Sequence, residues 1–375
     1  MTYAWTWCVV SATIRLMRIQ IQDAHTLVQW YDRNRRNLPW RDTGNPYDIW
    51  LSEIMLQQTR IEAVREKFIL IRNQLPDIHS LAECTEEKLL RLWEGLGYYS
   101  RARNLHRCAI TLVKEYDGKL PADYDQLLSL PGIGPYTAGA IASIAFGIPV
   151  PAVDGNVMRV IARLYKITED VRNPSTKAMI EQMIKDLFHQ DHDSHFVSSF
   201  NQGLMELGET VCLPNGTPQC EKCPLHHDCK TYQSGLWKEI PYRSAQRKRT
   251  VQNRTLLIIR DQQRFLIHRR PSSGLLAGMY EFYGVNGHLN RKKAVEHAQQ
   301  LGFYPISIHS LPSSTHIFTH LEWHMKAYEI TVADASDFNQ QDYLLVDETQ
   351  LADLPIPSAF RTYTVLYALR KEKNG

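Results

Sequence analysis

The sequence lacks the features of a secreted or membrane-spanning protein. It has seven cysteines in 375 residues, an odd total that does not describe a framework of paired disulfides. No apolar run approaches the length of a membrane span, and the first residues lack the basic leader and cleavage site of a signal peptide. We therefore expect a reducing compartment and no membrane partner, with Met17 as an alternative start of the chain.

Excess charge, internal repeats and low-complexity tracts are also missing. The net charge is only +3 and charged residues make up 22% of the chain. A polyanionic partner would therefore have to be recognised through local basic clusters and not through total charge. Apolar residues make up 43% of the sequence. The chain is also long enough to form two or three domains.

Two patterns of hydrophobicity divide the chain. From about residue 22 to 237 apolar residues recur at helical spacing, which predicts an all-α region. From residue 254 onward short alternating segments, at 255–260, 264–269, 307–311 and 323–331, predict an α+β domain. We therefore divide the chain into an N-terminal extension at 1–18, a candidate for disorder, a helical region at 19–240, a basic linker at 241–253 and an α+β domain at 254–375.

The most informative local feature is a cluster of four cysteines. Intervals of seven, two and five residues separate Cys212, Cys220, Cys223 and Cys229. Thiolates this close in a long chain usually bind zinc or an iron–sulfur cluster. Prolines and a glycine keep the segment out of a regular helix, so that it can wrap around a ligand. The spacing alone leaves both kinds of metal site open.

A Leu-Pro-Gly-Ile-Gly-Pro segment at 130–135 lies between two predicted helices, at 124–128 and 136–146. A Gly-x-Gly turn at a helix N-terminus exposes backbone N–H groups to which a DNA phosphate can bind without base specificity. The alternative is a tight turn whose glycines only supply a positive φ.

Glu53 is the first candidate catalytic carboxyl. It lies in a helix that Asn45 and Pro46 open and that we expect to run to Thr59. Apolar residues share its stripe, at three- and four-residue offsets. Such surroundings raise the pKa of a carboxyl and keep it protonated, as a general acid requires. An ordinary helix glutamate is the alternative.

Asp154 is the second candidate carboxyl. It immediately precedes a helix whose apolar face begins at Val157, and N–H groups at a helix N-terminus favour the ionised form. Simple capping explains this position equally well. One protonated and one ionised carboxyl is nevertheless the pair that cleavage of a glycosidic bond needs.

Together these motifs resemble the helix-hairpin-helix DNA glycosylases that carry a [4Fe-4S] cluster, and most closely the adenine DNA glycosylases of the MutY family. The resemblance also covers segments at 38–41, 53–59, 95–101 and 153–157. It implies an all-α glycosylase region with a [4Fe-4S] cluster on the four cysteines, although the first cysteine interval is one residue longer than the family's usual six. It further implies a monomer in the bacterial cytoplasm, associated with the nucleoid, that acts on double-stranded DNA containing adenine opposite 8-oxoguanine or guanine. Later base-excision repair enzymes would take over its product.

The resemblance also assigns roles to residues. Glu53 matches the general acid, Asp154 the carboxylate that stabilises the oxocarbenium-like sugar, and Tyr136 and Asn156 the residues that position the sugar and this carboxylate. Residues implied to line the adenine pocket are Arg36, Leu38, Trp40, Arg41, Leu56 and Gln202, and those implied to contact DNA are Gln58, Thr59, Leu96, Tyr98, Gly132 and Gly134.

Tyr136 separates this chain from its nearest alternative. Endonuclease III-like glycosylase/lyases have a Schiff-base lysine in that slot, and a tyrosine cannot replace it. We therefore expect a monofunctional glycosylase. An endonuclease III-like enzyme and a non-catalytic iron–sulfur DNA-binding protein stay as alternatives.

The C-terminal part resembles the Nudix-like domain of the same family, through residues 257–270 and 274–282. Where a Nudix hydrolase needs several glutamates for magnesium, this chain has Val295, Glu296, Gln299 and Gln300, so we do not expect pyrophosphate hydrolysis. The loop with Phe318, Thr319 and His320 resembles the family's 8-oxoguanine recognition loop, in which threonine here replaces the usual serine.

Overall fold

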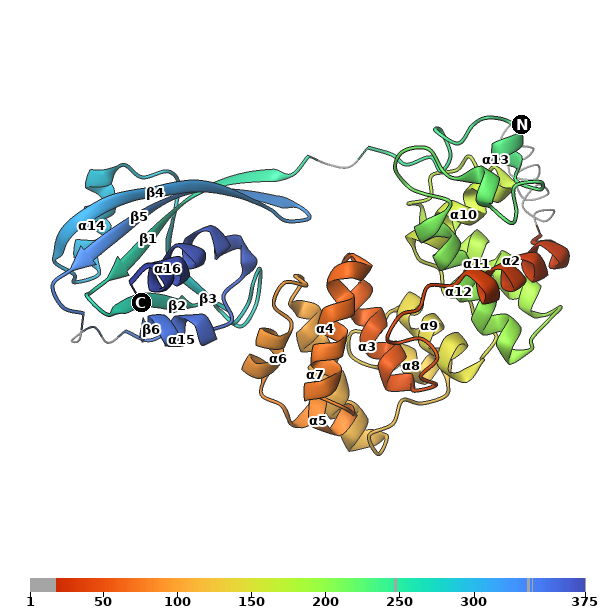
Figure 1. Ribbon diagram of the computed structural model, residues 1–375, viewed down its shortest axis with the longest axis horizontal. Helices are drawn as coiled ribbons and strands as arrows, with labels where there is room; N and C mark the ends of the chain where they lie inside the picture. The colour runs from red at the N-terminus through yellow and green to blue at the C-terminus, as the bar shows by residue number, and fades with distance from the viewer. Residues whose placement is uncertain (1–17, 246–247, 336–337, 339, 375) are drawn as a thin grey trace, which may run out of the picture. The chain divides into compact units, whose positions relative to one another are not determined.

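The computed structural model describes residues 18–245, 248–335, 338 and 340–374, with side chains described as far as residue 367. All of the predicted N-terminal extension except Arg18 lies outside the described residues. The contacts divide the chain into two compact units (Figure 1), one up to residue 83 and from 104 to 245, and one from 84 to 103 and from 246 onward. Among the described residues no helix is long and apolar enough to cross a membrane.

The first unit is built of helices, as the sequence predicts, because the described residues before Thr250 contain no strand. Its elements are α2 (Ile21–Asn34), α3 (Pro46–Leu56), α4 (Ile61–Gln74), α5 (Ile78–Glu83), α8 (Tyr124–Ser129), α9 (Pro135–Phe146), α10 (Gly155–Tyr165), α11 (Pro174–Phe188), α12 (Ser194–Thr210), η1 (Cys220–Lys222) and α13 (Lys230–Gln233). Helix α6 (Glu86–Leu92) belongs to the second unit, in which α7 (Ser100–Glu115) also begins.

Local sequence signals set the ends of the helices that bear the site. The side chain of Asn45 caps α3 by accepting a hydrogen bond from the Tyr47 N–H at 2.9 Å. The helix ends at Leu56, three residues before the predicted end, because Gln58 adopts φ 57° and turns the chain out of the helix. Helix α9 ends at Gly147, whose φ of 65° is the left-handed C-cap that glycine favours.

The small residues of α9 let the segment before Asp154 approach it closely. A Cβ atom on Gly139 would lie 2.2 Å from the carbonyl oxygen of Pro151, a distance that real Cβ atoms do not adopt. Glycine is therefore required at this position for packing and not for backbone freedom. This contact fixes the place from which residues 152–156 enter the site.

The second unit contains one six-stranded mixed sheet with the order β4-β5-β1-β3-β2-β6. Its strands are β1 (Thr250–Arg260), β2 (Arg264–Arg269), β3 (Tyr280–Asn286), β4 (Pro305–Ile317), β5 (Leu321–Val332) and β6 (Tyr343–Asp347). Strands β1 and β5 pair in parallel and the other pairs are antiparallel. The predicted α+β class is confirmed.

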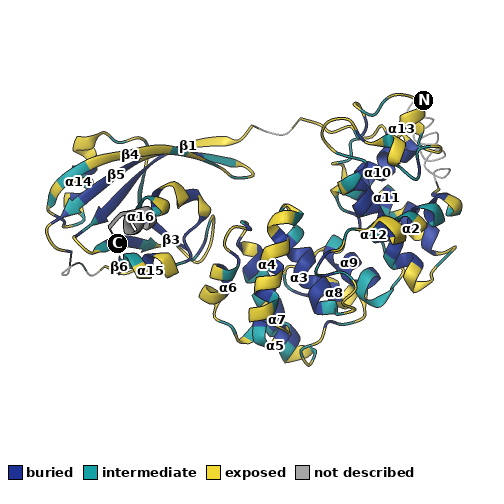
Figure 2. Ribbon diagram, in the orientation of Figure 1, coloured by how far each residue is buried: buried dark blue, intermediate teal, exposed yellow. Residues whose placement is uncertain are grey.

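The middle strands of this sheet contribute to two hydrophobic cores, whereas the edge strand β4 is largely exposed (Figure 2). The helical elements of this part are α14 (Arg291–Gln300), α15 (Glu348–Asp353), η2 (Ser358–Phe360) and α16 (Arg361–Asn374). Alternation along β1 sends Leu256 to a core shared with Phe360 and Tyr363, and Leu257 to a core shared with Ala294 of α14. A strand covered on both faces reads as a continuous apolar run, as residues 256–259 do.

Strands β1 and β4 are longer than predicted, because polar residues extend them beyond the apolar segments. Strand β1 begins at Thr250, inside the predicted linker, because its exposed first residues still pair their backbone with β5. Strand β4 extends well beyond the predicted 307–311 as an edge strand, with a register shift between Leu311 and Ser314. Proline at 312 fits such an irregularity. Strands β3 and β6 were not predicted.

We predict that Gly139→Ala destabilises the protein, although alanine is normally the better helix former. Overpacking against a backbone carbonyl should cost about 1–3 kcal/mol, measured as a lower melting temperature of the full chain. Gly155→Ala is the control, because a Cβ there meets no atom within 4 Å. An unchanged or higher melting temperature for Gly139→Ala would contradict this packing argument.

Candidate active site

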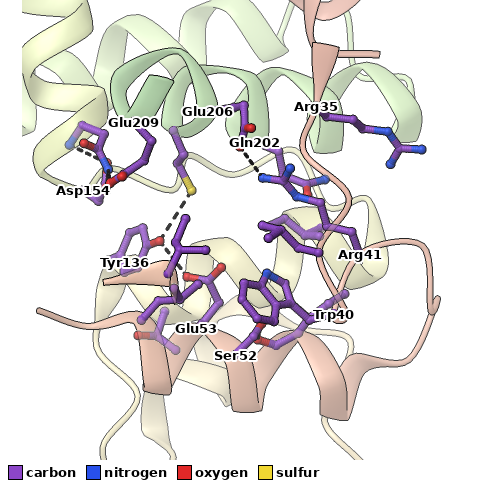
Figure 3. A pocket seen from close by; sticks show the side chains of 18 of the residues that line it. Arg35, Trp40, Arg41, Ser52, Glu53, Tyr136, Asp154, Gln202, Glu206 and Glu209 are labelled. Atoms are coloured by element: carbon purple, nitrogen blue, oxygen red, sulfur yellow. Dashed lines mark hydrogen bonds and ion pairs between the residues drawn. The ribbon is translucent and has the colours of Figure 1, made fainter. Parts of the chain in front are cut away.

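A cavity of about 1040 Å³ lies in the first unit (Figure 3). Its walls come from α3, α9 and α12, the N-terminal end of α10, and the loop between α2 and α3. It is lined by Glu53, Tyr136, Asp154 and Asn156, the four residues to which the sequence assigns the chemistry. These residues are up to 103 positions apart in the chain (156 − 53), so the fold alone brings them together.

Glu53 is held by Tyr136. The Tyr136 hydroxyl donates a hydrogen bond of 2.6 Å to Oε2 of Glu53, whose residue is only 8% exposed. Burial raises the pKa of Glu53 to about 7, and the nearby charge of Asp154 adds to the rise, while the Tyr136 hydrogen bond and Arg41 oppose it. The predicted burial of Glu53 is confirmed, and the carboxyl is half-protonated near neutral pH.

Asp154 is the N-cap of α10. Its Oδ1 accepts hydrogen bonds from the backbone N–H groups of Asn156 and Val157, both at 2.8 Å. Its Oδ2 accepts a third from Asn156 Nδ2, also at 2.8 Å. Burial raises the pKa of Asp154 and these bonds oppose the rise. The sequence argument anticipated the donors, which favour the ionised form, but not the burial, which outweighs them in the pKa.

Asn156 connects Asp154 to groups behind the site. Its amide also donates to Glu209 at 3.0 Å, and its Oδ1 accepts a hydrogen bond of 2.7 Å from Arg159. Arg159 in turn donates to the carbonyl oxygen of Cys212 at 2.8 Å. The side chain that orients Asp154 is therefore itself fixed on both sides.

Glu206 is a buried carboxylate that the sequence analysis missed. It is 1% exposed and accepts hydrogen bonds from Arg36 Nε at 2.6 Å and from Arg41 Nη2 at 2.7 Å. Burial alone would raise the pKa of Glu206, but the hydrogen bonds and charges of Arg36 and Arg41 outweigh it and lower the pKa. The three residues form a cluster of ion pairs in the cavity wall.

The spacing along α12 would have revealed this wall. Residues 202, 205, 206 and 209 all line the cavity and follow the three- and four-residue offsets of one helix face. Of these the sequence analysis singled out only Gln202, which accepts a hydrogen bond of 2.8 Å from the Tyr31 hydroxyl. The other predicted residues that line the cavity are Arg36, Leu38, Trp40, Arg41, Leu56, Gln58, Thr59 and Gly134.

Three residues predicted to contact DNA lie outside the lining of this cavity. Gly132 adopts φ 78° in the hairpin, where a Cβ would lie 2.4 Å from Asn104 Cβ, so glycine is required here both for the backbone conformation and for packing. Leu96 is 4% exposed and Tyr98 is 44% exposed, and both lie in the second unit. Their roles toward DNA stay predictions.

The four clustered cysteines line a second, smaller cavity together with Arg163 and Thr231. Among the described residues no three His, Cys, Asp or Glu side chains are close enough to bind a single metal ion. Burial and the neighbouring thiols raise the pKa of Cys220, and the pKa of Cys223 rises to about 12. Arg163 Nη1 lies 3.3 Å from Cys212 Sγ.

The predicted recognition loop lies between β4 and β5. Phe318 packs edge-on against Trp323, with ring centroids 4.9 Å apart, and is partly buried in the core. Thr319 and His320 are exposed. Within the second unit Thr319 Oγ1 lies 2.9 Å from the Tyr98 hydroxyl. Glu296, which remains from the Nudix signature, is exposed on α14.

Comparisons with known proteins agree with this layout. Residues 51–190 match the model of the HhH-GPD superfamily of base excision DNA repair proteins, and residues 254–364 match the NUDIX domain model. An adenine DNA glycosylase of Buchnera aphidicola from Schizaphis graminum is 34% identical over 257 residues, 68% of this chain and 73% of the relative. The mouse adenine DNA glycosylase is 31% identical, over 82% of this chain and 70% of its own length.

A solved structure of a thermostable thymine-DNA glycosylase is also similar. It covers 56% of this chain and 95% of its own, with 28% identity and a TM-score of 0.50. The cavity with its two carboxyls, the helical and Nudix-like regions and the curated relatives lead to one conclusion: this chain belongs to the adenine DNA glycosylase family and is a DNA glycosylase of base excision repair.

Proposed function

We propose that this enzyme hydrolyses the N-glycosidic bond of adenine mispaired with 8-oxoguanine or guanine in double-stranded DNA. The observation that carries the proposal is the pair of carboxyls in one cavity, the buried Glu53 with a pKa of about 7 and the half-buried Asp154 with three hydrogen bonds to its oxygens. A base inside a duplex cannot reach such a cavity, so the adenosine must be flipped out of the helix.

Glu53 acts as the general acid. Adenine is a poor leaving group until a ring nitrogen is protonated, and a carboxyl whose pKa is near the working pH transfers its proton most efficiently. The Tyr136 hydrogen bond fixes the Glu53 carboxyl on one side and leaves its other oxygen for the base. Water excluded from the closed site strengthens this interaction.

Asp154 stays ionised and faces the positive charge that develops on the sugar as the bond breaks. Its three donors stabilise the carboxylate, whereas Glu53 accepts one hydrogen bond from Tyr136. The ionised Asp154 also raises the pKa of Glu53. Each carboxyl therefore supports the protonation state that the other needs.

The adenine ring lies between apolar walls and a polar edge. Leu38, Trp40 and Leu56 supply apolar surface in the cavity. The guanidinium groups of Arg36 and Arg41, which the buried Glu206 holds in place, supply donors for ring nitrogens. Gln202, fixed by Tyr31, adds an amide to the same edge.

The four cysteines would hold a [4Fe-4S] cluster. Their thiols line one cavity, and their mutual repulsion in a buried place requires the positive charge of a metal group before they can ionise together. Such a cluster supplies one-electron redox chemistry and ties the loop to α10.

Recognition of the oxidised guanine is assigned to the loop of Phe318, Thr319 and His320, with Gln58 and Tyr98 beside the base pair. The contact of Thr319 with Tyr98 supports this assignment, because it joins two of these residues. The hydroxyl of Thr319 can serve as the serine of other family members does. The enzyme would act as a monomer at the nucleoid in the cytoplasm and pass its product to later repair enzymes.

The first test is base release from duplexes with adenine opposite 8-oxoguanine, guanine or cytosine. We expect release opposite 8-oxoguanine and guanine but much less opposite cytosine. Glu53→Gln should lower the rate by at least about 10²-fold, the contribution of a general acid, with little change in DNA affinity. Glu66→Gln, on the exposed face of α4, should keep the wild-type rate. Activity retained in Glu53→Gln would overturn the proposal, and borohydride trapping of a covalent adduct would favour a glycosylase/lyase instead.

A second prediction concerns the pH dependence of single-turnover base release. The rate should fall as the pH rises through about 7, where Glu53 loses its proton. Tyr136→Phe removes a hydrogen bond that stabilises the ionised carboxyl, so the pKa of Glu53 should rise further. The alkaline fall should therefore move to higher pH in this variant. A shift to lower pH, or none, would show that Tyr136 does not control this proton.

A further inference from the structure

Thr231 has a buried hydroxyl with no protein partner. The residue is 1% exposed, and within the part of the chain that the structure describes its Oγ1 makes no hydrogen bond. Leaving a buried hydroxyl unsatisfied is costly, so such a group usually marks a missing ligand or water. Thr231 also lines the same small cavity as the four cysteines.

The usual acceptor for this hydroxyl does not serve it. A threonine in a helix commonly bonds to the carbonyl oxygen four residues earlier, but Thr231 Oγ1 makes no hydrogen bond to the His227 carbonyl, which accepts one from Gln233 Nε2. Among the polar side chains of the cavity wall, Arg163 can only donate, and His226 and Tyr232 pair with the Cys223 carbonyl and with Glu221. The four cysteine sulfurs are the acceptors that all line the cavity with Thr231.

Thr231 also lies close to one of the four cysteines in the chain. It is two residues beyond Cys229, the N-cap of α13, and Thr231 itself lies in α13. Both residues line the same cavity. The Thr231 hydroxyl therefore needs only a sulfur atom within this cavity to complete a hydrogen bond.

We propose that the Thr231 hydroxyl donates a hydrogen bond to a sulfur of the iron–sulfur cluster and thereby raises the reduction potential of that cluster. The inference rests on the [4Fe-4S] cluster proposed above. Sulfur carries more negative charge in the reduced cluster, so a donated hydrogen bond stabilises the reduced state more than the oxidised state. Thr231 is a positioning residue for the cofactor and takes no part in base release.

The test is an electrochemical measurement of the cluster's midpoint potential in the full-length holoenzyme. The electrode supplies the electron. Thr231→Val keeps the shape of the side chain and removes the hydroxyl. The midpoint potential of this variant should be more negative than that of the wild type. At the same applied potential, the ratio of oxidised to reduced cluster should be about three- to tenfold higher. A tenfold change corresponds to about 59 mV for one electron.

Two variants serve as controls. Thr231→Ser retains a hydroxyl and should stay near the wild-type potential. Ser234→Ala removes an exposed hydroxyl of the same segment, which donates to the carbonyl oxygen of Lys230 at 2.7 Å, and should change nothing. Should Thr231→Val fail to accumulate, Thr231→Ala must shift the potential in the same direction.

The outcomes separate this inference from the cluster itself. Wild-type protein without iron and sulfide would overturn both proposals. If the wild-type protein carries a full cluster and Thr231→Val or Thr231→Ala has the same midpoint potential, the proposed hydrogen bond is overturned and the cluster proposal stands. A more negative potential in the variant, restored by Thr231→Ser, supports it.

Discussion

The site depends on one constraint, the burial of the Glu53 carboxyl where few donors can stabilise its charge. Desolvation raises the pKa of a buried carboxyl, and only hydrogen bonds or positive charges can lower it again. Here the Tyr136 hydroxyl supplies one short hydrogen bond of 2.6 Å and Arg41 supplies a distant charge. The balance leaves the pKa of Glu53 at about 7, where the group can both hold a proton and release it.

The packing of the helices creates the difference between the two carboxyls. Glu53 projects from the middle of α3, where the backbone N–H groups are already used within the helix. Asp154 lies just ahead of α10, where the first N–H groups of the helix have no partner within it. The close contact of Gly139 with Pro151 brings the segment of Asp154 against α9, which carries Tyr136. Helix position thus gives Asp154 two backbone donors that Glu53 lacks.

Local sequence signals predicted what depends on neighbouring residues. The stripe around Glu53 predicted its burial, Asn45 and Pro46 predicted the start of α3, and apolar alternation predicted strands at 264–269 and 323–331. Contacts between distant segments were beyond such signals. The Tyr136 hydrogen bond spans 83 residues and the ion pairs of Glu206 span 165 and more. Strands β3 and β6 were missed because backbone pairing with β2 tolerates the mixed polarity of these segments.

The central claim concerns where one proton resides, and titration of the two carboxyls in the free enzyme tests it most directly. Carbon-13 labelling of glutamate and aspartate side chains, with Glu53→Gln and Asp154→Asn to assign the two signals, reports each carboxyl separately. The account predicts that Glu53 titrates near pH 7 and that Asp154 titrates at lower pH. Loss of the Glu53 proton at or below 4.5, the ordinary pKa of a glutamate, or a proton on Asp154 at neutral pH, would contradict it.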